Sequence, residues 1–193
     1  MLRILIGTVA CVNFYFCLCM AARADEPLLH LKKGDKIVLI GNTQAERMQY
    51  FNNWETTLHT RFPEHNLVVR NLGFSGDTIN VRMRSLDFPD HGHTLIDHQP
   101  NVILAFFGFN ESFAGPEGLP AFEKDLAKFL TDLKQLKYPV QNYPRGDYEP
   151  KLQDKTGEVK VTPTIVLVSP SANENLTDRG ILAADWNNKN IEL

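Results

Sequence analysis

The sequence predicts an α/β protein with a mostly parallel sheet covered by helices on both faces. Four short apolar runs, at 36–40, 67–70, 102–107 and 164–168, have the length and composition of buried strands. Two amphipathic helical patterns lie between them, and strands that alternate with helices are typical of βαβ units. A polar loop follows each apolar run, and functional groups of such sheets gather at the carboxyl ends of the strands.

The amino-terminal half contains the first two predicted strands. Lys36–Ile40 is the first and ends at Gly41, and Leu67–Arg70 is the second. Between them, apolar residues recur every three or four positions from Gln44 to Arg61, which predicts one continuous helix that Pro63 stops. The stripe consists of Met48, Phe51, Trp54, Leu58 and Phe62.

The carboxyl-terminal half repeats the pattern. Val102–Phe107 and Thr164–Val168 are the third and fourth predicted strands. The helix between them is marked by Leu119, Phe122, Leu126, Phe129, Leu130 and Leu133. Residues 138–162 are polar and rich in Pro, Gly and charge, so we interpret them as a surface insertion, either a hairpin of its own or a mobile loop.

Residues 1–24 have the pattern of a secretory signal peptide. Arg3 precedes an apolar run from Ile4 to Met20, and an Ala-Arg-Ala cleavage site at 22–24 comes just before Asp25. The alternative is a membrane anchor, for which the run is short. We therefore expect an exported protein, periplasmic or extracellular, with one domain at 25–193 and no stable membrane insertion after removal of the signal.

Composition excludes several classes of protein. With 43% hydrophobic and 22% charged residues, the chain is neither disordered nor collagen-like. Its formal net charge of −3, which becomes −5 without the signal, excludes a basic footprint for nucleic acid. All three cysteines, Cys11, Cys17 and Cys19, lie in the signal, so the mature protein has no disulfide, thiolate nucleophile or cysteine-based zinc site. We expect no cofactor.

Histidines are the other candidate metal ligands. His91, His93 and His98 cluster with Asp90 and Asp97. A metal site there is conceivable, but the spacing matches no specific motif, and a solvated loop is the favoured interpretation.

Three residues in the strand-end loops have chemistry suited to catalysis. Thr43, between a strand and a helix, is either a nucleophile or, with Asn42, a helix cap. Gly76 either brings its N–H close to a ligand or forms a tight turn. Asn110 either donates to an oxyanion or braces neighbouring loops.

The three loops together resemble the SGNH hydrolases, also called GDSL esterases. The segment 40–43 (IGNT) is similar to the family's first block, 71–78 (NLGFSGDT) to its second, and 108–111 (GFNE) to its Gly-x-Asn-Asp third block. The resemblance implies a three-layer α/β/α fold with a flavodoxin-like sheet. It also implies acyl transfer, with Thr43 as nucleophile and with Gly76 and Asn110 as oxyanion donors.

The sequence departs from the family in three places. Thr43 replaces serine, and Asn42 replaces aspartate. The family's Asp-x-x-His block, which supplies the general base, has no counterpart after Ser169. Because residues 187–193 resemble the start of a helix, we expect a C-terminally incomplete domain from a truncated gene, or else a short non-catalytic version.

These observations predict an exported ester-hydrolase-like protein acting on acyl or acetyl esters of a small molecule or carbohydrate. We expect weak or absent catalysis in the chain as it stands, since loss of the general base costs orders of magnitude in rate. The alternative is a non-catalytic module that binds acetylated glycans or carboxylates on the same fold. A third possibility is a fragment that does not fold alone.

Overall fold

The computed structural model describes residues 29–51, 53–82, 95–135, 137–139, 158–160, 162–180 and 184–193. Contacts divide the chain into residues 1–30 and residues 31–193, and all of the helices and strands below belong to the second unit. The predicted signal peptide lies outside the described residues. Within the described part, no helix is both long and apolar enough to cross a membrane.

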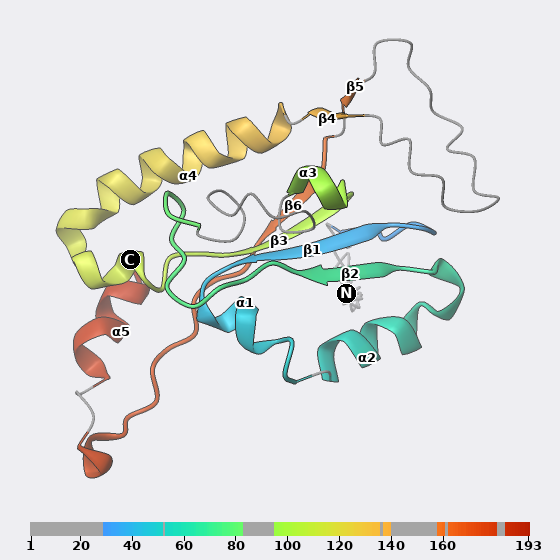
Figure 1. Cartoon of the computed structure of the whole chain (residues 1–193). Helices are drawn as coiled ribbons and strands as arrows, with labels where there is room; N and C mark the ends of the chain where they lie inside the picture. Colours follow the sequence, from blue (N-terminus) through green and yellow to red (C-terminus); the bar gives the residue numbers. More distant parts are fainter. Residues whose placement is uncertain are drawn as a thin grey trace, which may run out of the picture. The chain divides into compact units, whose positions relative to one another are not determined.

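A four-stranded parallel sheet forms the centre of this unit (Figure 1). Its strands are β1 (Lys36–Gly41), β2 (Val68–Asn71), β3 (Val102–Phe106) and β6 (Thr164–Leu167), in the order β2-β1-β3-β6. In register, Ile37 pairs with Val69 on one side and with Val102 on the other. The order is that of the first four strands of a flavodoxin-like sheet, which confirms the predicted fold class.

Helices lie on both faces of the sheet (Figure 1). The long helix α4 lies on one face, and α1 and α2 lie on the other. The helices are α1 (Thr43–Arg47), α2 (Asn53–Arg61), α3 (Leu95–His98), α4 (Leu119–Lys134) and α5 (Asp185–Ile191); single turns of 3-10 helix are η1 (Pro63–His65), η3 (Glu111–Ala114), η4 (Pro116–Gly118) and η5 (Thr177–Arg179).

The core is built from the two central strands. Every residue of β3, and every residue of β1 after Lys36, is buried, because these strands are covered on both faces. On one face the core cluster joins β1 and β3 to the buried side of α4 through Val38, Ile40, Leu72, Ile79, Ile103, Ala105, Phe107, Phe129 and Leu133. The apolar spacing that predicts α4 is thereby confirmed.

The prediction of one helix over 44–61 is wrong. Helix α1 ends at Arg47, a turn follows, and α2 begins at Asn53. In a continuous helix the carbonyl of Ala45 would accept from the amide of Gln49, but here it accepts from the side chain of Asn71 at 2.6 Å and from the amide of Met48 at 3.2 Å. The amide of Gln49 bonds to Glu46 one residue later, so the backbone turns away.

The insertion at 138–162 is described only at its two ends. Strands β4 (Lys137–Pro139) and β5 (Glu158–Lys160) pair antiparallel, with Tyr138 opposite Val159. The pairing fits the hairpin alternative at the base of the insertion. The residues between these strands lie outside the described part.

Candidate active site

Three polar loops meet at the carboxyl edge of the sheet, after β1, β2 and β3. The chain passes from β1 to β2 on one side and then returns to β3 on the other side of β1. Such a reversal of strand order is where open α/β sheets bind their ligands. Topology therefore places the three predicted site residues at the edge where a site is expected.

Thr43 is the first residue of α1 and is half-buried. The helix cap is its neighbour Asn42, whose side-chain oxygen accepts from the amide of Gln44 at 3.0 Å. Asn42 is only 2% exposed, so its side chain is committed to this role. The hydroxyl of Thr43 makes no hydrogen bond to any other described residue. Of the two residues that the sequence offers as the cap of this helix, the structure therefore assigns capping to Asn42.

The second loop packs directly on α1. A methyl group on Gly73 would lie 2.6 Å from the Cβ of Ala45 and 2.7 Å from the backbone nitrogen of Glu46, so only glycine fits. Farther along, the amide of Ser75 donates to Glu46 Oε2 at 2.9 Å, and the Ser75 hydroxyl donates to the same oxygen. These contacts fix the loop against the residues that follow β1.

Gly76 forms the exposed turn of this loop. Its φ of +90° is one that side chains rarely adopt, yet a Cβ here would meet nothing within 4 Å. The amide of Gly76 makes no hydrogen bond within the described part of the chain. The sequence offers two roles for Gly76, a tight turn and an amide that faces a ligand. Because the turn leaves the amide without a partner in the described part of the chain, Gly76 can have both roles.

Asn110 joins the third loop to the second. Its side-chain nitrogen donates to the carbonyl of Asp77 at 2.7 Å, directly after Gly76. The bracing role is therefore present. A carboxamide nitrogen carries two protons, however, and this bond uses one of them. Asn110 can hold the turn and still donate to a ligand beside Gly76.

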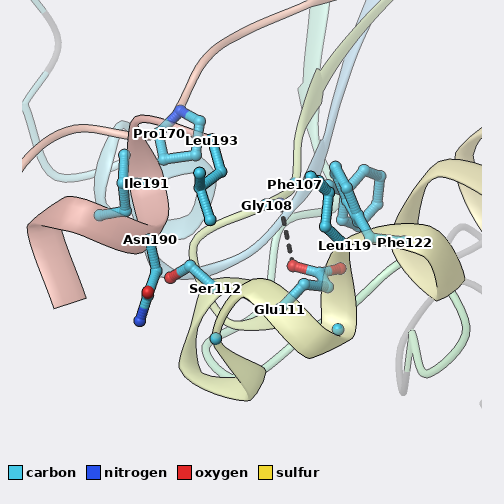
Figure 2. A pocket seen from close by; sticks show the side chains of 12 residues that line it. Phe107, Gly108, Glu111, Ser112, Leu119, Phe122, Pro170, Asn190, Ile191 and Leu193 are labelled. Atoms are coloured by element: carbon cyan, nitrogen blue, oxygen red, sulfur yellow. Dashed lines mark hydrogen bonds between the residues drawn. The ribbon is translucent and has the colours of Figure 1, made fainter.

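Glu111 is a positioning residue that sequence reasoning missed. One of its carboxylate oxygens accepts from the amide of Ile79 at 2.8 Å, and the other accepts from the amide of Gly108 at 2.9 Å (Figure 2). It thereby links the second loop to the end of β3. The only signal in the sequence is an acidic residue beside Asn110, which gives no indication of these two distant partners.

Arg82 donates a hydrogen bond from its guanidinium to the carbonyl of Ile79, at the end of the second loop. Its guanidinium lies 5.1 Å from the ring centre of Phe129 and 6.0 Å from that of Phe107. Burial lowers the pKa of Arg82, while the charges of Asp77 and Asp132 raise it. An arginine guanidinium in a protein stays protonated at neutral pH. A fixed positive charge therefore lies near Asp77, which is 1% exposed.

A cavity of about 110 Å³ adjoins the site. Its wall is mostly apolar, and Figure 2 shows the carboxylate of Glu111 beside Phe122 and Gly108. The apolar wall consists of Phe107, Leu119, Phe122, Pro170, Ile191 and Leu193. Thr43, Gly76 and Asn110 do not line it, so this cavity lies next to the predicted site rather than within it.

The described histidines of residues 31–193 lie toward the other edge of the sheet. The carbonyl of His65 accepts from Gly34, just before β1, and His98 belongs to α3, just before β3. His59, in the last turn of α2, lies 3.8 Å from Glu55. Among the described residues no cluster of His, Cys, Asp and Glu could hold a metal ion. His91, His93 and Asp90 lie outside them.

Comparisons with known proteins support the fold. No protein-family model matches the chain, and no curated protein matches it. Among solved structures, a gut microbial diltiazem-metabolizing enzyme is similar, with a TM-score of 0.58 and 20% identity over 84% of this chain. The match covers 33% of that enzyme, so this chain spans about a third of its length.

Two further structures match more distantly. An acetylxylan esterase from Geobacillus stearothermophilus has a TM-score of 0.47 at 18% identity, covering 85% of this chain and 73% of its own. An alpha/beta hydrolase enzyme from the metagenome of Lake Arreo, Spain, has a TM-score of 0.35 at 20% identity, covering 53% and 54%. The first of the three matches supports the α/β fold of the chain, as predicted.

Proposed function

We propose that this protein is an SGNH-type ester-hydrolase-like domain that receives acyl or acetyl esters at the carboxyl edge of its sheet. One observation carries the proposal. The hydrogen bond from Asn110 to the carbonyl of Asp77 places the carboxamide beside the open turn at Gly76, while Gly73 and Ser75 hold the same loop against α1. The second loop is thus in contact with α1 on one side and with the third loop on the other.

The proposed chemistry is attack of the Thr43 hydroxyl on an ester carbonyl. The bond from the carbonyl carbon to the alcohol oxygen breaks, the alcohol leaves with the proton that Thr43 loses to water, and a second water then releases the acyl group as a carboxylic acid and restores the hydroxyl. The oxygen of that carbonyl becomes negative as the bond forms, and backbone amides and a carboxamide proton suit that charge. Gly76 and Asn110 would supply such donors, with the amide of Thr43 as a third. The loops are fixed by hydrogen bonds before substrate arrives, so little reorganisation is required.

We expect turnover to be weak or absent. The methyl group of Thr43 restricts χ1 and crowds the nucleophile. Residues 169–193 contain no histidine, and the described histidines of residues 31–193 lie toward the amino ends of the strands. None of these described histidines is therefore proposed as a general base, and in the absence of one only the oxyanion donors and substrate positioning would accelerate the reaction.

Hydrolysis of p-nitrophenyl acetate by the purified protein tests the proposal. Removing an oxyanion donor costs about 100-fold or more in kcat, so Asn110→Ala should lower any measured rate by this order. Thr43→Ala should abolish enzyme-specific turnover, whereas Thr60→Ala, an exposed threonine on α2, should leave it unchanged. Robust turnover that survives Thr43→Ala would contradict the assignment of the nucleophile.

The second candidate function is binding without cleavage, as a module for acetylated glycans or carboxylates. Two observations favour it. The hydrogen bonds that hold the second and third loops are present, so a ligand site can be formed, whereas a threonine stands where the resembled family has its serine nucleophile. Calorimetry with acetate and with an acetylated xylo-oligosaccharide should then show saturable binding that Asn110→Ala weakens. Absence of binding to a folded sample removes this candidate.

Export and partners complete the proposal. We propose that residues 1–24 direct export and that the mature chain begins at Asp25. The ligand is a small-molecule or carbohydrate ester, and nucleic acid is not a partner, because the mature chain is acidic. Amino-terminal sequencing of protein recovered outside the cytoplasm tests the cleavage position, and retention of residues 1–24 would contradict it.

A further inference from the structure

Three aromatic rings, two from the loop around Asn110 and one from α5, form a connected cluster. Phe109 contacts Phe113 edge-on, with ring centres 5.6 Å apart, and Phe113 contacts Trp186 with centres 6.1 Å apart. We call Phe109, Phe113 and Trp186 the aromatic platform. Phe113 is 50% exposed and Trp186 is 63% exposed, so the platform faces solvent.

The platform is held by hydrogen bonds beneath it. The side chain of Asn187, 3% exposed, donates to the hydroxyl of Ser112 at 2.8 Å, and this hydroxyl donates to the carbonyl of Phe109 at 2.6 Å. Since Asn187 follows Trp186 and Ser112 precedes Phe113, these bonds hold together the two backbone segments that carry the exposed rings.

Carboxamides, rather than one sign of charge, flank the platform. Asn110 follows Phe109, and Asn190 lies one turn beyond Trp186, where its side-chain nitrogen makes two long contacts of 3.5 Å, to the Trp186 carbonyl and to Asn187 Oδ1. The exposed charges nearest to Trp186 along α5, Asp185 and Lys189, have opposite signs. A ligand that complements this surface is uncharged, with an apolar face and hydroxyl groups at its rim.

We propose that the aromatic platform binds a sugar ring of a neutral saccharide. The C–H groups on the face of a pyranose suit the negative face of an aromatic ring, and its hydroxyls can pair with the carboxamides of Asn110 and Asn190. This inference rests on the proposed function, because it names the alcohol part of the ester as carbohydrate. The ester group then lies toward Asn110, between the platform and Gly76.

Fluorescence titration of the full chain tests the proposal. The chain has two tryptophans, Trp54 and Trp186, so in Trp54→Phe only Trp186 reports. The probes are xylotetraose, cellotetraose and chitotetraose, which carry no O-acyl ester. We expect a saturable change in Trp186 emission with at least one of them.

Calorimetry on variants provides the matched comparison. Phe113→Ala and Trp186→Ala should each weaken binding by about fivefold, which corresponds to about 1 kcal/mol, and Trp186→Phe should retain most of the affinity. Phe51→Ala removes an aromatic side chain that is 66% exposed in the turn after α1 and should have no effect. Far-UV circular dichroism identifies variants that fail to fold. If an alanine variant does not fold, the saccharide affinity of the conservative variant at the same position, Phe113→Tyr or Trp186→Phe, is measured in its place.

Other outcomes overturn the proposal. These are no saturable binding of any of the three probes to folded protein, or equal binding by all platform variants. A concentration-dependent dimer in sedimentation that Trp186→Ala abolishes would assign the platform to a second copy of this chain. Failure of the platform is distinguishable from failure of the proposed function: saccharide binding without p-nitrophenyl acetate hydrolysis leaves the platform intact, whereas hydrolysis without saccharide binding removes the platform alone.

Discussion

Gly73 and Gly76, three residues apart in one loop, are required for different physical reasons. At Gly73 the limit is space, because the Cβ of Ala45 and the backbone of Glu46 occupy the position of a side chain. At Gly76 the limit is backbone conformation, since φ is +90° while the space around it is open. The first glycine lets the loop pack on α1, and the second lets the backbone make the exposed turn that follows.

This difference predicts different costs for the same substitution. Gly76→Ala should destabilise the fold by about 1–2 kcal/mol, the price of a left-handed conformation for a residue with a side chain. Gly73→Ala should cost about 3 kcal/mol, because the atoms it meets belong to backbone and Cβ positions that cannot rotate away. Urea unfolding of both variants measures the two values, and equal costs would contradict the interpretation of the loop.

At the scale of elements, η3 holds the site together. Glu111 at its first position links the amides of Ile79 and Gly108, and Ser112 at its second contacts Asn187 of α5. One short turn of helix therefore fixes the second loop, the end of β3 and the last helix. The sequence of η3 has no feature that distinguishes it from other turns, and its role depends on hydrogen bonds to residues outside it.

Glu111→Gln tests this role. Glutamine keeps one acceptor oxygen but presents an NH₂ group to the other amide, which loses its partner. We expect a loss of about 1–3 kcal/mol in the free energy of unfolding. Glu117→Gln, at an exposed acidic residue of η4, is the matched control and should change stability by less than about 0.5 kcal/mol. Equal effects of the two substitutions would rule out the bridging role.

The attachment of α5 can be measured separately. Ser112→Ala and Asn187→Ala should each destabilise the protein, but the double variant should cost less than the two together, because they remove the same hydrogen bonds. We expect a coupling energy on the order of 1 kcal/mol from the double-mutant cycle. Additive effects would mean that α5 is held by other contacts.

The whole molecule depends on the two central strands. Ile103 is fully buried between α4 and the sheet, whereas Leu167 on the edge strand β6 is 49% exposed. Ile103→Ala should therefore cost about 2–5 kcal/mol, and Leu167→Ala about 1 kcal/mol. A domain has only about 5–15 kcal/mol of total stability, so the loss expected for Ile103→Ala should shift the whole urea unfolding transition to a lower concentration. Comparable losses at both positions would contradict the placement of the core.

Prediction from sequence succeeded where local pattern and tertiary structure agree. The strands β1, β3 and β6 begin where their apolar runs begin, and α4 follows its stripe, because burial on both faces of a strand or one side of a helix imprints that pattern. The helix over 44–61 failed because Asn71, in another loop, competes for the carbonyl of Ala45. No local pattern contains that partner.

The same distinction separates the components of the site. The sequence by itself determined the α/β class, the parallel strands and the loops that carry Thr43, Gly76 and Asn110, since each depends on the residues within one short segment. Only the tertiary structure decided that Asn42 and not Thr43 caps α1, that Asn110 contacts the Gly76 turn, and that Glu111 and Asn187 hold the loops and the aromatic platform. The physical reason is that a polar side chain finds its hydrogen-bond partner in space, and in this fold those partners lie up to 75 residues away along the chain.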